Sequence, residues 1–129
     1  MTVTVYGIPN CDSIKKARRW LDENGVTYRF HDYKKDGIDE ASLERWAGEV
    51  GWETLLNRRG TTWRKLTEEE QADVNEEKAI VLMKAHNALI KRPVIEHDGG
   101  PLLVGYDPEA YEDAGLVESG SEEIGEEDV

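Results

Sequence analysis

Residues 6–13 read Tyr6-Gly7-Ile8-Pro9-Asn10-Cys11-Asp12-Ser13, and they join a β-branched stretch to a segment of helical period. The preceding Thr2–Tyr6 predicts a strand, which Gly7 ends with a turn. The one cysteine of the chain therefore stands where a helix begins. The unpaired backbone N–H groups and partial positive charge of a helix start stabilise a thiolate or a bound anion. Cys11 is thus the candidate nucleophile; the alternative is a small side chain that fills a gap between strand and helix.

The length and charge of the chain limit the kinds of protein it can be. Its 129 residues, 38% of them apolar, fit one domain. The formal net charge of −12 opposes a general affinity for nucleic acid or for an anionic membrane. One cysteine excludes an intramolecular disulfide, the amino terminus lacks a signal-peptide pattern, and no apolar run approaches a membrane span. We therefore expect a cytoplasmic protein.

The end of the sequence differs in composition from the rest. Six of the 28 acidic residues lie in residues 118–129, where there is no lysine or arginine. A segment of acids, glycines and serines cannot bury enough apolar surface to fold. We predict one folded domain over residues 1–117, followed by an acidic, disordered tail over residues 118–129.

The first third of the chain has the pattern of a βαβ unit. Apolar residues recur at helical spacing from Ile14 to Leu21, and Gly25 supplies the helix stop. Alternation returns in residues 28–33, with aromatic side chains at 28, 30 and 33. A strand, a helix and a strand within about thirty residues predict two parallel strands joined by a right-handed crossover.

The middle of the chain is predicted to be mostly helical. Polar caps begin three predicted helices, at Asp39, Thr67 and Asn75. The last of these helices carries an apolar stripe that continues to Ile90. Between the helices, residues 57–64 have no period and are predicted to form a loop.

The last third contains two short predicted strands, Val94–Ile95 and Leu102–Val104, on either side of a glycine-rich turn. Asp107 and Pro108 then introduce a final helix. The order is βαβ, a helical stretch, and ββα. It predicts an α/β, thioredoxin-like fold, in which a four-stranded mixed sheet carries a helical insertion between its two halves.

Three motifs in this order resemble the arsenate reductase and Spx family, and most closely its YffB branch of thiol reductases. They are Val5-Tyr6-Gly7-Ile8-Pro9-Asn10-Cys11-Asp12-Ser13-Ile14-Lys15-Lys16-Ala17, Leu55-Leu56-Asn57-Arg58-Arg59-Gly60-Thr61-Thr62-Trp63-Arg64-Lys65-Leu66 and Leu89-Ile90-Lys91-Arg92-Pro93-Val94. The resemblance implies a thioredoxin-like fold with a nucleophilic Cys11. It also implies that Arg59 and Arg92 hold an anionic group near the sulfur, and that the bond before Pro93 is cis. Asn10, Ser13 and Lys15 complete the predicted substrate- and anion-binding residues.

Two departures from the family pattern bear on the substrate. Residues 103–106 read Leu-Val-Gly-Tyr where the arsenate reductases have a third arginine, so one oxyanion ligand is missing. Ile14 stands where the Spx regulators carry the second cysteine of Cys-x-x-Cys, which removes a switch based on that pair. We therefore expect an oxidoreductase: a monothiol, glutathione-dependent thiol/disulfide reductase with Cys11 as nucleophile. Glutathione is the expected co-substrate, and we expect no tightly bound cofactor.

Two alternatives remain open from the sequence. The first is an arsenate reductase coupled to a glutaredoxin, with an oxyanion in place of a small thiol as substrate. The second is a non-catalytic, Spx-like regulatory or binding protein, and only this alternative calls for RNA polymerase as a partner. A metal site is not expected, since three scattered histidines and one cysteine give no metal-ligand spacing.

Overall fold

The structure is a computed structural model, and it describes residues 2–116, so the predicted tail lies outside the described residues. Its elements follow one another as β1 (Val3–Gly7), α1 (Asp12–Glu23), β2 (Arg29–Asp32), α2 (Tyr33–Asp36), α3 (Glu40–Val50), α4 (Trp52–Leu55), α5 (Thr61–Arg64), α6 (Glu68–Gln71), α7 (Glu76–Ala85), the 3-10 helix η1 (Asn87–Leu89), β3 (Val94–His97), β4 (Leu103–Val104) and α8 (Pro108–Asp113). None of the described helices is long and apolar enough to cross a bilayer.

The strands described within residues 2–116 form one mixed, four-stranded sheet in the order β2-β1-β3-β4. β1 pairs with β2 in parallel, from Thr4 opposite Arg29 to Gly7 opposite Asp32, as the βαβ pattern predicts. β3 runs antiparallel to both β1 and β4. The predicted thioredoxin-like, α/β fold is confirmed, with helices α3 to α7 inserted between the two halves of the sheet.

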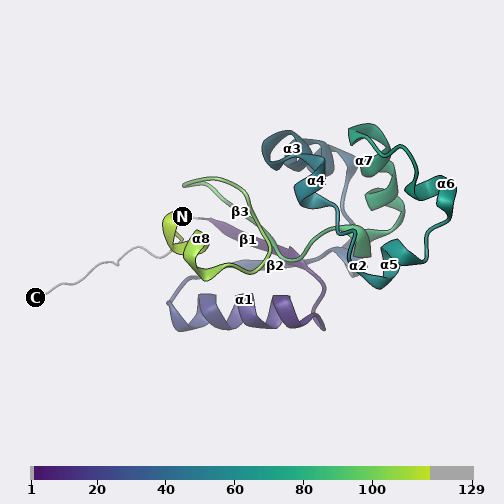
Figure 1. The fold of residues 1–129 in the computed structure, drawn as a ribbon. Helices are drawn as coiled ribbons and strands as arrows, with labels where there is room; N and C mark the ends of the chain where they lie inside the picture. The colour runs from purple at the N-terminus through teal and green to yellow at the C-terminus, as the bar shows by residue number, and fades with distance from the viewer. Residues whose placement is uncertain (1, 117–129) are drawn as a thin grey trace, which may run out of the picture.

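Two hydrophobic cores lie on the two faces of the sheet. In the ribbon, α1 lies on one side of the sheet and α3, α4 and α7 lie on the other (Figure 1). α1 and α8 pack on one face, where Val5, Ala17 and Tyr111 are fully buried. The helices of the insertion pack on the other face, around the fully buried Trp46. Alternation along β1 explains the division, because Val5 points into the first core while its neighbour Tyr6 packs against the second.

Among the differences between the predicted and the observed element boundaries, three concern helices. Tyr33 was predicted to end the second strand but begins α2, because the Asp32 carboxylate accepts hydrogen bonds from the backbone N–H groups of Lys34 (3.0 Å) and Lys35 (3.2 Å). Thr61–Arg64, within the predicted loop, forms α5; four residues are too few to show a period. The last helix of the insertion ends at Ala85, and η1 carries the remaining apolar residues toward Ile90.

Glu96 on β3 links the sheet to α3 through hydrogen bonds. Its carboxylate accepts hydrogen bonds from the Tyr6 hydroxyl (2.7 Å), the Trp46 indole (2.8 Å) and the Arg45 guanidinium (2.7 Å). Burial raises the pKa of this carboxyl, but the hydrogen bonds from Arg45, Trp46 and Tyr6 outweigh it and hold the pKa below its usual value. Burial, together with the hydrogen bond to Glu96, raises the pKa of Tyr6 to about 12.

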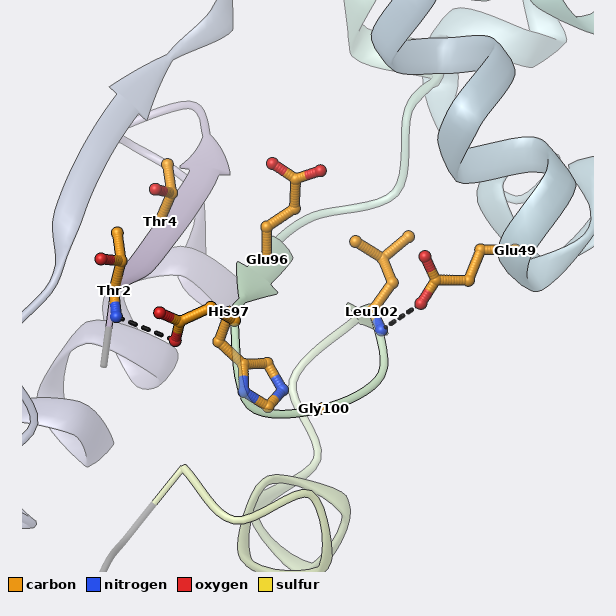
Figure 2. A pocket seen from close by; sticks show the side chains of 8 residues that line it. Thr2, Thr4, Glu49, Glu96, His97, Gly100 and Leu102 are labelled. Carbon is orange, nitrogen blue, oxygen red and sulfur yellow. Dashed lines mark hydrogen bonds between the residues drawn. The ribbon is translucent and has the colours of Figure 1, made fainter.

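Glu96→Gln is expected to lower the free energy of unfolding at pH 7 by about 2 kcal/mol, because an amide cannot accept from all three donors. The control is Glu49→Gln. Glu49 lines the same hollow as Glu96 (Figure 2), but among residues 2–116 its carboxylate accepts a single N–H, from Leu102 (2.7 Å), which an amide oxygen also accepts. Its expected loss is below about 1 kcal/mol. Urea unfolding followed by tryptophan fluorescence measures both.

The effect of Glu96 should also depend on pH. Since its pKa is lower in the folded protein than in the unfolded chain, its stabilisation is present above the unfolded pKa and is lost as the pH falls through the folded pKa. Wild type and Glu96→Gln should therefore converge in stability in acid. A difference that stays constant down to pH 2 would show that the charge of Glu96 does not stabilise the fold.

Candidate active site

Cys11 follows the end of β1 and is the N-cap residue of α1, as the sequence predicts. Its backbone is extended (φ −102°, ψ 134°), and its carbonyl accepts the first helical hydrogen bond from the Lys15 N–H (3.0 Å). The side chain is partly buried. The thiol therefore lies at the positive end of α1 and is open to solvent on one side.

Close packing of β1 against α1 fixes this helix start. Gly7 lies against the fully buried Ile14, and a Cβ at position 7 would overlap Cδ1 of Ile14 and lie 2.9 Å from its Cγ1. Glycine is needed at this position for space. Ile14, which replaces the second cysteine of a Cys-x-x-Cys pair, is a core residue that holds α1 on the sheet.

Gly7→Ala is expected to destabilise the protein by about 1–3 kcal/mol, because Ile14 has to move within a filled core. Adding Ile14→Val removes the overlapping Cδ1 and should recover part of the loss. Gly48→Ala is the control, since Gly48 lies in α3 and a methyl group there would have no atom within 4 Å beyond the nearby backbone of its own helix, and it should gain about 0.5–1 kcal/mol. Urea denaturation measures the three variants; a neutral Gly7→Ala would rule out the tight contact.

Arg92 is the charged partner of Cys11. Its Nε donates to the Cys11 Sγ at 3.5 Å, and its Nη1 donates to the carbonyl oxygens of Ala88 (2.9 Å) and Ile90 (3.5 Å). The guanidinium is partly buried, and the bond that follows, to Pro93, is cis as the family resemblance implies. The carbonyl groups of η1 and the residue after it thus hold the guanidinium against the sulfur.

Two opposing influences set the acidity of the Cys11 thiol. Burial raises its pKa and is the largest single cause. The hydrogen bond from Arg92 opposes it, the backbone N–H groups of Ile14 and Ser13 at the helix start act in the same direction as Arg92, and the pKa is held below its ordinary value. A larger fraction of Cys11 is therefore thiolate near neutral pH, and the thiolate is the reactive nucleophile.

The sequence did not single out Tyr33, which completes the surroundings of Arg92. Tyr33 is fully buried, and its hydroxyl donates to the Ile90 carbonyl (3.0 Å), which also accepts from Arg92. The backbone carbonyl of Tyr33 accepts from the side-chain amide of Asn87 (2.8 Å). An aromatic residue at a strand end normally indicates core packing. The sequence signal for a different role of Tyr33 was the spacing of the aromatic residues, which changes from two (28 to 30) to three (30 to 33).

The predicted residues on either side of Cys11 lie at the same helix start, and among the described residues none of them forms a hydrogen bond with Arg92. Asn10 and Lys15 are exposed and Ser13 is partly buried. These three residues are near Cys11 in the sequence, and the exposed Lys15 side chain is accessible to an anion from solvent. Within the part of the chain that the structure describes, no three His, Cys, Asp or Glu side chains come together as a metal site.

Arg59 lies on a neighbouring loop, and its side chain is exposed. The loop is joined to the residues before Arg92, because the Asn57 N–H donates to the Leu89 carbonyl at 2.7 Å. Among residues 2–116, no hydrogen bond or ion pair links the Arg59 side chain to Cys11. The structure thus brings Arg92 to the sulfur and leaves Arg59 on the adjoining loop.

Comparison with known proteins points to one family. A sequence model of the ArsC family matches residues 6–114. The solved YffB protein is 57% identical and superposes with a TM-score of 0.83, covering 87% of this chain and 97% of that one. An arsenate reductase related protein from Brucella melitensis is 52% identical, with a TM-score of 0.71 over 88% of this chain and 93% of its own. The global transcriptional regulator Spx of Bacillus subtilis is 31% identical over 111 residues, which are 81% of this chain and 79% of the regulator.

Proposed function

Because the chain belongs to the ArsC family, we propose that it is a monothiol, glutathione-dependent thiol/disulfide reductase. The observation that carries the proposal is the contact between Arg92 Nε and the sulfur of the chain's one cysteine, at the start of α1. A single activated thiol is able to exchange with a disulfide, but it has to borrow a second thiol to complete a cycle.

The cycle has two exchange steps. In the first, the Cys11 thiolate attacks the glutathionyl sulfur of a mixed disulfide R–S–SG; the old S–S bond breaks, Cys11–S–SG forms, and the released RS⁻ takes a proton from water. In the second, the thiolate of glutathione attacks the glutathionyl sulfur bound to Cys11, so that oxidised glutathione leaves and the Cys11 thiolate returns. The two steps sum to R–S–SG + GSH → RSH + GSSG, so each turn consumes one free glutathione, and the other half of the oxidised glutathione comes from the substrate.

Charge around Cys11 supports glutathione as the co-substrate. Glutathione carries two carboxylates, and guanidinium and ammonium groups pair well with carboxylates. Arg92 is committed to the sulfur and to two backbone carbonyls, while the exposed Lys15 and Arg59 stand at the helix start and on the adjoining loop. We therefore assign stabilisation of the thiolate to Arg92, and attraction of the glutathione carboxylates to Lys15 and Arg59.

Mass spectrometry of the protein after reaction with oxidised glutathione tests this function. We expect one glutathionyl adduct, on Cys11, which excess glutathione removes. The neutral hydroxyethyl disulfide is the matched probe, and the preference for glutathione over it should fall several-fold in Arg59→Ala, where one cation is lost. If no adduct forms, the proposed function is rejected; equal rates with the two disulfides would reject the role of Arg59 and Lys15.

The resemblance to Spx favours a second candidate, a regulatory protein without catalysis that docks on RNA polymerase. If the protein is such a regulator, Cys11→Ser leaves its regulatory activity intact, and a pull-down with RNA polymerase recovers a stable complex. Arsenate reduction is decided separately, by turnover of arsenate in the presence of glutathione and glutaredoxin.

A further inference from the structure

Tyr33 is held at both ends to the segment that carries Arg92. Its hydroxyl donates to the Ile90 carbonyl at 3.0 Å, and its own carbonyl accepts from Asn87 Nδ2 at 2.8 Å. Asn87 lies in η1 and Ile90 directly follows it, so the two hydrogen bonds span the short segment that leads into Arg92. Because Tyr33 is fully buried, water cannot replace the hydrogen bond between its hydroxyl and Ile90 without a cavity opening.

The Ile90 carbonyl is shared between Tyr33 and the guanidinium. Arg92 Nη1 lies 2.9 Å from the Ala88 oxygen and 3.5 Å from the Ile90 oxygen, while its Nε reaches the Cys11 sulfur at 3.5 Å. The direction of the Ile90 carbonyl therefore affects where the guanidinium rests. A carbonyl released from Tyr33 is free to turn toward Arg92 and draw Nη1 away from its present position.

We propose that Tyr33 is a positioning residue of the thiolate site: its buried hydroxyl fixes the Ile90 carbonyl and thereby holds the Arg92 guanidinium at the Cys11 sulfur. Tyr33 acts through Arg92 and makes no hydrogen bond to the sulfur itself among the described residues. The ionisable groups that face its phenol are Arg92, Cys11 and Asp32. The inference extends the proposed function, but it concerns the state of the thiol and does not require glutathione as co-substrate.

The test is the pH profile of Cys11 alkylation by iodoacetamide, which reports on one site because the chain has one cysteine. Tyr33→Phe should slow alkylation at pH 6 by about three- to tenfold and move the profile to higher pH, because a displaced guanidinium stabilises the thiolate less. The matched control is Tyr111→Phe. Tyr111 is also fully buried, and its hydroxyl donates to the Gly105 carbonyl (2.6 Å) in the core on the other face of the sheet. Its profile should coincide with that of wild type.

A double-mutant comparison separates positioning from a general loss of stability. In an Arg92→Ala background, adding Tyr33→Phe should leave the alkylation profile unchanged, because the group through which Tyr33 acts is gone. Asn87→Ala provides a second variant in case Tyr33→Phe does not fold, and it should move the profile in the same direction to a smaller extent.

The proposal is overturned if Tyr33→Phe keeps the wild-type profile, if it moves the profile equally with and without Arg92, or if Tyr111→Phe moves it as much. The outcome is distinguishable from failure of the proposed function. A normal effect of Tyr33 in a protein that forms no glutathionyl adduct would reject the glutathione-dependent reaction and keep Tyr33 as a positioning residue.

Discussion

Cys11→Ser is expected to abolish turnover of a glutathionyl mixed disulfide, with a loss of at least about 1000-fold, because both exchange steps pass through the Cys11 sulfur. A serine hydroxyl at this position is protonated near neutral pH and cannot form the intermediate disulfide. The measurement is the coupled reduction of a glutathionylated peptide in the presence of excess glutathione. No second cysteine of the chain is able to substitute for Cys11.

The fold should survive this substitution, since the sulfur is only partly buried and packs outside the two cores. The free energy of unfolding of Cys11→Ser should lie within about 1 kcal/mol of wild type, which separates loss of chemistry from loss of structure. Retention of turnover in Cys11→Ser would reject the nucleophilic role of Cys11 and with it the proposed reductase.

The second large effect is expected from Arg92→Ala. Removing the guanidinium takes away the charged hydrogen bond that lowers the pKa of Cys11, while the burial that raises it remains. A hydrogen bond to a charged group contributes about 1.5–3 kcal/mol, so alkylation of Cys11 at pH 6 should slow by about 10- to 100-fold. The higher pKa of Cys11 in Arg92→Ala leaves less thiolate at low pH, so this variant should react more slowly than wild type there. The rates of the two proteins should converge at high pH, where Cys11 is ionised in both.

Two arginines of the insertion, and a lysine in place of Arg92, provide the controls for Arg92→Ala. Arg58 is exposed, and Arg58→Ala should leave both the alkylation profile and the preference for glutathione unchanged. Arg59→Ala should keep the profile but weaken the reaction with oxidised glutathione. Arg92→Lys should fall between wild type and Arg92→Ala, because lysine keeps the charge without the fork of donors that reaches Ala88 and the sulfur together. An Arg92→Ala profile equal to that of wild type would reject its role at the thiolate.

The elements with strong local signals were predicted from the sequence. The predicted caps at Asp39, Thr67 and Asn75 begin helices in the structure, and Thr67 forms a capping box with Glu70. The parallel pair of strands and the later antiparallel pair follow from the length of their connections. The segments that were missed are short: a four-residue helix such as Thr61–Arg64 buries too little to impose a period, and its conformation is set by the elements around it.

The sequence by itself determined the order of the strands and of the longer helices along the chain, and the place of Cys11 at the start of α1, because periodicity, caps and turns act between near neighbours. The choice of Arg92 over Arg59 as the group that contacts the sulfur was decided only by the tertiary structure. Arg92 and Cys11 are 81 residues apart, and their contact forms where the carbonyl groups of Ala88 and Ile90 hold the guanidinium beside the start of α1. The family motifs pointed to both arginines, and packing between segments far apart in the sequence decides which of them reaches the sulfur.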